Sequence, residues 1–363
     1  MRFRSIAGSR LIAFCFMLVV SAAPALAADV APLVAKGTAF LEKAQAEDGS
    51  WSSDTGVGVT ALVTTALLKN GKTSDDPTVA KAIEYLSQFV QEDGGIYKPG
   101  STHRNYETCL AVVAFHLANK DGKYDDLVAK AEKYIKEVQW DGGEGHAESS
   151  TNYGGAGYGS HSRPDLSNTS FLINTLKELG TSEDDPAIQK ALIFVSRCQN
   201  LKTEHNETDF ADKISDGGFY YTIAAGGSSQ AGAESDGGLR SYGSMTYAGL
   251  KSMLYAGVNA DDERVKAAFD WITKNYTVEE NPGMADSGLY YYYHTFAKSL
   301  DAVGKPAVVD DKGTSHDWKA ELVEELGKRQ NEDGSWTNSQ PRWLENDPNL
   351  VTGYVLLALS YCK

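Results

Sequence analysis

An internal repeat constrains the fold of this 363-residue chain more than any other feature. Six segments share one layout, in which a lysine and a small residue precede an aromatic residue, a glutamine, and then Asp-Gly with a further aromatic. The fifth segment, from Lys266, is degenerate. Such self-similarity indicates that one supersecondary unit is stacked several times. The first unit shows the pattern in the residues Lys36, Phe40, Gln45, Gly49 and Trp51.

Each unit predicts two helices. Its first segment has apolar residues at helical spacing and often begins behind Asp-Pro or Asp-Asp, which favour a helix start. Its second segment is apolar all round, which is typical of a buried helix. Six outer helices around six inner ones predict an all-α (α/α)6 toroid, a closed barrel of six helical hairpins in a single domain, residues 28–363. We expect the inner helices at residues 57–68, 106–117, 166–179, 242–256, 289–300 and 350–359.

The first 27 residues are expected to be a secretory signal peptide. A basic start precedes an apolar run at residues 11–20, and Ala25-Leu26-Ala27 fits a cleavage site. We therefore expect export to the periplasm or the extracellular medium, with no transmembrane span after cleavage; an uncleaved anchor is the alternative. Removal of three arginines lowers the formal net charge from −15 to −18. So acidic a chain is not expected to bind nucleic acid.

Three long loops are expected to form the working face of the barrel. They cover residues 140–164, 200–240 and 331–346, and all outer-to-inner connections of such a barrel emerge at one end. Long connections are uncommon unless they are functional, so we expect a concave ligand site at this mouth. The alternative is that the loops only cover the barrel end. The ligand-binding candidates in the inner helices and loops are Asn168, Tyr242, Tyr247, Tyr293 and Trp343.

The repeat resembles the QW repeat of squalene–hopene cyclases and other triterpene cyclases. The helix-pair toroid is shared with the beta subunits of protein prenyltransferases. The resemblance covers nearly all of residues 30–363. It implies a central cavity that holds a hydrophobic ligand of terpenoid or polyprenyl-like type. It also implies that the glutamine and tryptophan of the repeat tie helices together, so we interpret them as structural.

The catalytic motif of the class II terpene cyclases is incomplete in this chain. These enzymes protonate an alkene with Asp-x-Asp-Asp, often followed by Thr, at the start of an inner helix. The nearest match is Asp165-Leu166-Ser167-Asn168-Thr169, in which the two later acids of the motif are replaced by Ser167 and Asn168. Asp165 is therefore one catalytic candidate, for a cyclase- or mutase-like isomerase, and a helix cap is the alternative.

The zinc site of the prenyltransferases is also incomplete. The stretch Tyr293-His294-Thr295 resembles the segment that supplies the zinc-binding histidine of that family, but Tyr242-Gly243-Ser244 stands where its Asp-x-Cys would fall. One ligand of three does not hold zinc. We therefore expect neither a metal nor a cofactor, and His294 is the second catalytic candidate, with a core histidine as the alternative.

Two other functions stay open. One is a non-catalytic binding or scaffold protein of the cell envelope that uses its mouth loops on an envelope component. The other is a carbohydrate-active α/α barrel that uses mouth carboxylates such as Glu234 and Asp236, by analogy of fold. The pairing of Cys109, Cys198 and Cys362 also stays open.

Overall fold

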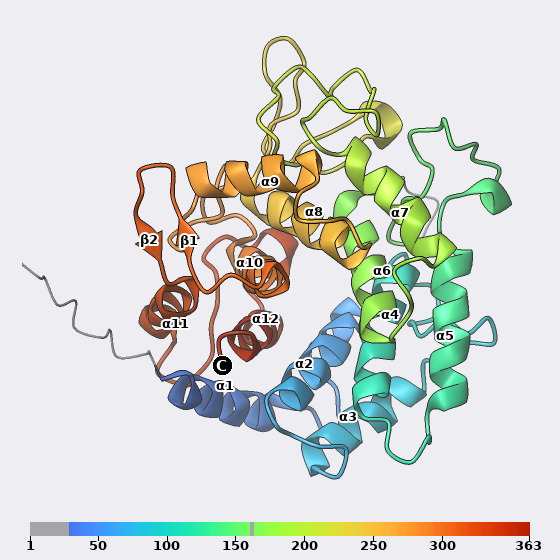
Figure 1. The fold of residues 1–363 in the computed structure, drawn as a ribbon. Coiled ribbons are helices and arrows are strands. Elements are labelled where there is room, and N and C mark those ends of the chain that lie inside the picture. Colours follow the sequence, from blue (N-terminus) through green and yellow to red (C-terminus); the bar gives the residue numbers. More distant parts are fainter. Residues whose placement is uncertain (1–28, 160–162) are drawn as a thin grey trace, which may run out of the picture.

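The computed structural model describes residues 29–159 and 163–363, so the predicted signal peptide lies outside the described residues. Within these ranges, twelve α-helices alternate between an outer and an inner ring (Figure 1). This arrangement confirms the predicted all-α toroid. The outer helices are α1 Val30–Ala44, α3 Pro77–Ser87, α5 Asp125–Glu137, α7 Pro186–Arg197, α9 Glu263–Lys274 and α11 Trp318–Arg329. The inner helices are α2 Gly58–Lys69, α4 Arg104–Leu117, α6 Leu166–Glu178, α8 Gly243–Tyr255, α10 Leu289–Val303 and α12 Pro348–Ser360. A small hairpin of β1 Val308–Val309 and β2 Ser315–His316 lies between α10 and α11.

The inner ring is closed. Each inner helix packs against the next along the chain, and α12 packs against both α10 and α2 (Figure 1). The outer helix α1 in turn packs against α12, so the first and last units are neighbours. Because every inner helix contacts helices on both sides, its residues are buried almost all round, as in α2 from Gly58 to Leu67.

None of the helices in the described part of the chain is long and apolar enough to cross a membrane.

In four of the six units the repeat glutamine joins the unit to the next one; in the second unit Gln91 donates only to carbonyl oxygens of its own unit. The Nε2 of Gln199 donates to the carbonyl oxygen of Gly217 in its own unit and to that of Arg264 in the next outer helix, both at 2.9 Å. Gln45 and Gln139 make the same pair of bonds in their units. The first bond reaches the turn of the same unit, and the second reaches the first turn of the next outer helix, so one side chain connects the two units.

The same contact also closes the ring, because the Nε2 of Gln330 donates to Leu33 in α1 at 3.2 Å. The repeat tryptophans act within a unit instead. The Nε1 of Trp51 donates to Leu41 at 2.9 Å, and that of Trp336 donates to Leu326 at 2.8 Å. Both features therefore tie helices together.

The repeat glycine is a site of close backbone approach. Gly49 has a φ of +90°, and a Cβ there would lie 2.4 Å from the carbonyl oxygen of Lys81 in the next outer helix. In the third unit Gly154, not Gly142, has this role, since a Cβ on Gly154 would lie 1.9 Å from the oxygen of Lys190. The insertion of this unit thus lies before the glycine, whereas the sequence pattern places the glycine at Asp141-Gly142 and the insertion after it.

A threonine in the first turn of the inner helix is a further part of the repeat. The Oγ1 of Thr169 accepts the backbone N–H of Ala156 at 3.0 Å, and Thr60 accepts that of Trp51 at 3.0 Å. Thr108, Thr246 and Thr352 do the same in their units. The threonine of Asp165-Leu166-Ser167-Asn168-Thr169 is therefore explained by the toroid itself, and it adds nothing to the likeness with a cyclase motif.

Candidate functional site

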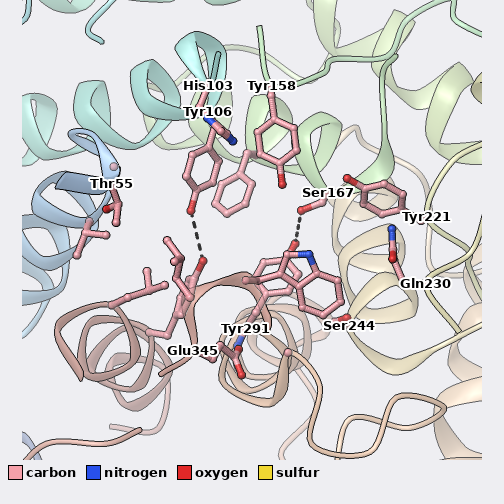
Figure 2. Close-up of a pocket in the computed structure, with 18 of the residues that line it drawn as sticks. Thr55, His103, Tyr106, Tyr158, Ser167, Tyr221, Gln230, Ser244, Tyr291 and Glu345 are labelled. Atoms are coloured by element: carbon pink, nitrogen blue, oxygen red, sulfur yellow. Dashed lines mark hydrogen bonds between the residues drawn. The ribbon is translucent and has the colours of Figure 1, made fainter. Parts of the chain in front are cut away.

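A cavity of about 290 Å³ lies on the axis of the toroid at the N-terminal ends of the inner helices (Figure 2). All six inner helices contribute to its wall, each mostly from its first two turns. The cavity therefore exists only because the ring closes. The helix residues that line it are Gly58, Val59, Tyr106, Glu107, Ser167, Phe171, Ser244, Met245, Tyr291, Leu350 and Tyr354.

The wall is mainly aromatic. Six tyrosines line the cavity together with Phe171 and Trp343; they are Tyr106, Tyr158, Tyr221, Tyr242, Tyr291 and Tyr354. Burial raises the pKa of the Tyr242 and Tyr291 hydroxyls, so they stay neutral near pH 7. The surface thus offers ring faces and uncharged hydroxyl groups.

Two hydroxyl contacts cross the axis (Figure 2). The hydroxyl oxygens of Tyr106 in α4 and Tyr354 in α12 lie 3.4 Å apart, and the Ser167 Oγ in α6 lies 2.9 Å from the Tyr291 hydroxyl in α10. In each pair one inner helix of the ring stands between the two partners. These contacts therefore fix the positions of the aromatic rings across the cavity.

The three long loops meet at the mouth of this cavity. Tyr158 comes from residues 140–164, Tyr221 from residues 200–240 and Trp343 from residues 331–346, and all three line the wall. Arg342 is hydrogen-bonded to Gln230, which joins the last two of these loops. The loops therefore gather on one rim and contribute residues to the cavity.

The rim is strained at its apolar tip. Trp343 and Leu344 have φ angles of +57° and +64°, a region that is costly for residues other than glycine. Their side chains are 44% and 45% exposed although both are large and apolar. Backbone strain of this kind clusters at ligand clamps and switch regions, and here it lies against the cavity.

Asp165 caps the helix α6 and is fully buried beside the cavity. Its carboxylate accepts the backbone N–H of Asn168 at 2.9 Å and the Nδ2 of Asn168 at 2.8 Å. Burial raises the pKa of Asp165 to about 6, although the bonds from Asn168 act against this rise. The Tyr221 hydroxyl lies near the carboxyl group and lines the cavity. The side chain of Tyr221 therefore lies between the carboxyl group of Asp165 and the cavity.

Two buried glutamates of the wall are not among the residues that the sequence predicts. The Oε1 of Glu345 accepts the backbone N–H of Tyr291 at 2.8 Å, and the Oε2 of Glu107 accepts that of Lys98 at 3.1 Å. Burial raises the pKa of both carboxyl groups. Glu345 thereby satisfies the exposed N–H groups at the start of α10. No local sequence signal singles out Glu107, because the first turn of α4 also contains Arg104 and Asn105.

The predicted ligand-binding residues fall into two groups. Tyr242 and Trp343 line the cavity, and Asn168 lies buried behind its wall. Tyr247 packs between helices α8 and α10, with its ring centroid 5.6 Å from that of Tyr292. The Tyr293 hydroxyl donates to the carbonyl oxygen of Val278 at 2.8 Å, outside the cavity. The exposed pair of Glu234 and Arg240 lies on the loop surface.

His294 lies deeper on the axis than the aromatic wall. Its ring is 5.7 Å from that of Tyr354. Burial, and then the charges of Lys298, Lys251 and Lys69, lower the pKa of His294 well below its usual range, although Glu178 acts against this. A ring among ammonium groups does not fit a zinc site, which needs neighbouring anionic or neutral ligands. Among residues 29–159 and 163–363, no three histidine, cysteine, aspartate or glutamate side chains form a metal-binding group.

Comparisons with known proteins place the fold. The family described as the squalene-hopene cyclase C-terminal domain matches residues 53–224. The solved type II terpene cyclase MstE from Scytonema is 14% identical with a TM-score of 0.55, over 91% of this chain and 97% of the cyclase. A variant of MstE in complex with its substrate, geranylgeranyl dihydroxybenzoate, is 12% identical with a TM-score of 0.55, over 92% and 96% of the two chains.

A carbohydrate-active protein has the same architecture. The family 88 glycosyl hydrolase from Bacteroides vulgatus is 10% identical with a TM-score of 0.55, over 92% of this chain and 98% of the hydrolase. No curated protein matches the sequence. At these identities the likeness concerns the fold alone.

Proposed function

We propose that the axial cavity of this α/α toroid, whose fold is similar to that of a type II terpene cyclase, binds a compact hydrophobic ligand of terpenoid or polyprenyl-like type. The observation that carries the proposal is the ring of six tyrosines, Phe171 and Trp343 around a closed axis. Aromatic faces pack well against apolar rings and chains. The MstE variant holds a ligand of this chemistry, a geranylgeranyl compound.

The size of the cavity limits the ligand. A volume of about 290 Å³ is at the lower end of the roughly 300–1,000 Å³ that small-molecule sites occupy. We therefore propose a ligand closer in size to farnesol than to squalene. The strained tip at Trp343 and Leu344 borders the opening and offers apolar surface along which such a ligand enters.

Binding is favoured over cyclisation. Ser167 lines the cavity where the cyclase motif has its acid, and its hydroxyl pairs with Tyr291. An alkene is a weak base, so its protonation needs a strong acid in contact with it. The buried carboxyl of Asp165, with a pKa of about 6, is a weak acid held at a helix cap behind the wall.

The test is ligand retention by the purified protein. The protein is incubated with farnesol, squalene or an envelope lipid extract, separated from free ligand, and examined by native mass spectrometry. We expect farnesol to be retained, and Phe171→Trp to weaken its binding at least tenfold because the larger ring fills the cavity. The matched control is Phe89→Trp, since Phe89 packs against Tyr85 away from the cavity. Retention that is absent, or equal in the two variants, contradicts the proposal.

A carbohydrate ligand is the second candidate. The observation that favours it is the pair of buried glutamates, Glu107 and Glu345, in an aromatic wall, because a carboxyl group with a raised pKa is a general acid for glycoside cleavage. The glycosyl hydrolase neighbour shares the fold. A glycan panel tests it: binding or cleavage that Glu107→Gln abolishes supports this candidate, and a panel without either rejects it.

We also propose that the protein acts outside the cytoplasm, on the basis of the basic, apolar and small-residue segments within residues 1–27. The mass of the protein recovered from a secreting host tests this, since cleavage after Ala27 removes those residues.

A further inference from the structure

The axis of the toroid carries a second level of cross-ring contacts below the aromatic cavity. Glu178 in α6 accepts Lys69 of α2 at 2.9 Å and Lys298 of α10 at 3.0 Å. One inner helix stands between α6 and each of these partners in the ring. The three side chains therefore meet on the axis. Burial raises the pKa of Glu178, but the two ammonium groups outweigh burial and hold the pKa at about 2.

A layer of unpartnered polar atoms lies one helical turn closer to the mouth. Thr65, Asn174 and His294 each precede by four residues the ion-paired residue of the same helix, so each shares that residue's axial face. All three side chains are more than nine-tenths buried. Within the described residues, the Thr65 Oγ1, the Asn174 Oδ1 and the His294 Nδ1 have no hydrogen-bond partner.

The charges around this layer do not balance. Lys251 of α8 is buried with 1% of its surface exposed. Burial and the neighbouring charge of Lys298 lower the pKa of Lys251 well below its usual range, although Glu178 acts against this, so its ammonium group lacks a compensating negative charge. The cluster thus combines three lysines with one carboxylate. A buried excess of positive charge is costly unless an anion compensates it. Buried hydroxyl, amide and imidazole groups without partners are also unfavourable, because they lose the hydrogen bonds that they make in water.

We propose that this axial layer is a binding site for a compact monoanion, held by Lys251 and Lys298 and by N–H or O–H donors of Thr65, Asn174 and His294. The Thr65 hydroxyl and the His294 Nδ1 can each donate one hydrogen bond to the anion, and Asn174 donates through its amide Nδ2 when the amide is turned with that nitrogen toward the layer. The anion is either a free halide or the acid group of a molecule in the cavity above, because Tyr354 lines the cavity and touches His294. The site is independent of the proposed function of the cavity.

Bromide is the probe for this site. Crystals soaked in sodium bromide are examined by anomalous scattering, and the melting temperature is measured as sodium bromide replaces sodium gluconate at constant ionic strength. We expect an anomalous peak among Lys251, Lys298 and His294, and a melting temperature that rises with bromide as for any ligand of the folded state. A layer that holds only water, with no anomalous peak, overturns the proposal.

Variants separate the site from general salt effects. Lys251→Met keeps the length of the side chain and should lower the bromide affinity about tenfold, as expected for the loss of a charge-assisted hydrogen bond. Thr65→Val keeps the shape and should lower it several-fold. Lys328→Met is the control, since Lys328 is exposed on α11. A bromide response equal in all these variants and the wild type contradicts the inference.

A competition experiment assigns the source of the anion. Crystals and solutions of bromide-loaded protein receive 2-naphthoate or 2-naphthylmethanol, which share their ring system and differ in the acid group. Displacement of bromide by the acid alone supports the site with an acid-bearing ligand. Retention of bromide against both compounds supports the site with a free anion. Displacement by both alike shows that the layer does not select a negative charge, and this result overturns the proposal.

Discussion

At the residue scale, the sequence offers two alternative interpretations of Asp165, a catalytic carboxyl group or a helix cap. In the structure the residue is a cap and its carboxyl group is also buried. It caps α6 through Asn168, as expected for an aspartate at a helix start. It also lies in the interior with a pKa of about 6. The sequence predicts the cap, because the residue precedes an apolar periodic segment. The raised pKa follows from the loops that bury the carboxyl group, and no local pattern encodes this.

The first prediction follows from this pKa. The unfolded chain ionises Asp165 near pH 3.9 and the folded chain near pH 6, so between these values the folded state binds more protons. The stability of the wild type relative to Asp165→Asn should therefore fall by about 2 kcal/mol from pH 4 to pH 7. Urea unfolding of both proteins across this range measures the difference.

Asp185→Asn is the control for this experiment. Asp185 caps α7, and Lys136 and the Ala187 N–H lower its pKa against the effect of partial burial. The unfolded state then binds more protons, so the relative stability of the wild type should rise with pH instead. Parallel curves for the wild type and Asp165→Asn would show that the carboxyl group is not buried as described.

The second prediction concerns the strained tip. Leu344 has a φ of +64°, which glycine adopts freely and alanine does not. Leu344→Gly should therefore be about 1 kcal/mol more stable than Leu344→Ala. At Leu127 in the helix α5 the same pair of substitutions should give the usual order, with alanine more stable. Thermal unfolding of the four variants measures these differences. If alanine is more stable than glycine at both sites, the backbone at residue 344 is not strained.

At the element scale, the repeat determines the contacts between units. The six predicted inner segments agree with the inner helices to within three residues at either end, because apolar periodicity and aspartate starts are local signals. The third unit shows where this reasoning stops. Its Asp141-Gly142 has the expected letters, but Gln139 donates to Gly154. Only the position of the next outer helix distinguishes the two glycines.

The third prediction tests this difference. Gly154→Ala would place a Cβ against the carbonyl oxygen of Lys190 at a φ of +80°, and should destabilise the protein by about 3 kcal/mol or more. Gly142→Ala should be almost neutral, because a Cβ there has no atom within 4 Å in the described structure. Chemical denaturation of both variants compares them. Equal destabilisation by the two substitutions would contradict the assignment of Gly154 as the repeat glycine of the third unit.

At the scale of the whole molecule, the ring brings together side chains that are far apart in the sequence. The sequence predicts the toroid and the side on which its long loops gather, since both follow from the order of the units. It does not predict which residues of the inner helices face the axis. Tyr242 and Tyr247 both lie near the start of α8. Tyr242 lines the cavity, whereas Tyr247 packs between two helices.

The fourth prediction concerns the contacts across the axis. Glu178→Gln would leave the buried Lys251 and Lys298 and the partly buried Lys69 without a carboxylate, and should destabilise the protein by about 3–5 kcal/mol. Glu324→Gln removes an exposed carboxylate paired with Lys328 and should change stability by less than about 1 kcal/mol. Calorimetric unfolding at neutral pH gives both values. A small effect at Glu178 would mean that the lysines around it are already neutral or compensated.

Because Gln330 of the last unit is hydrogen-bonded to Leu33 of the first, the contacts of the ring do not depend on which unit comes first in the chain. The seam between the last and first units uses the same glutamine bridge as three of the joints inside the chain. Asp29 and Lys363 also border one surface hollow, so the two ends of the folded part are close together. A circular permutant that joins these ends by a short linker and opens at another exposed turn would keep every joint of the ring, and with them the shape of its axis.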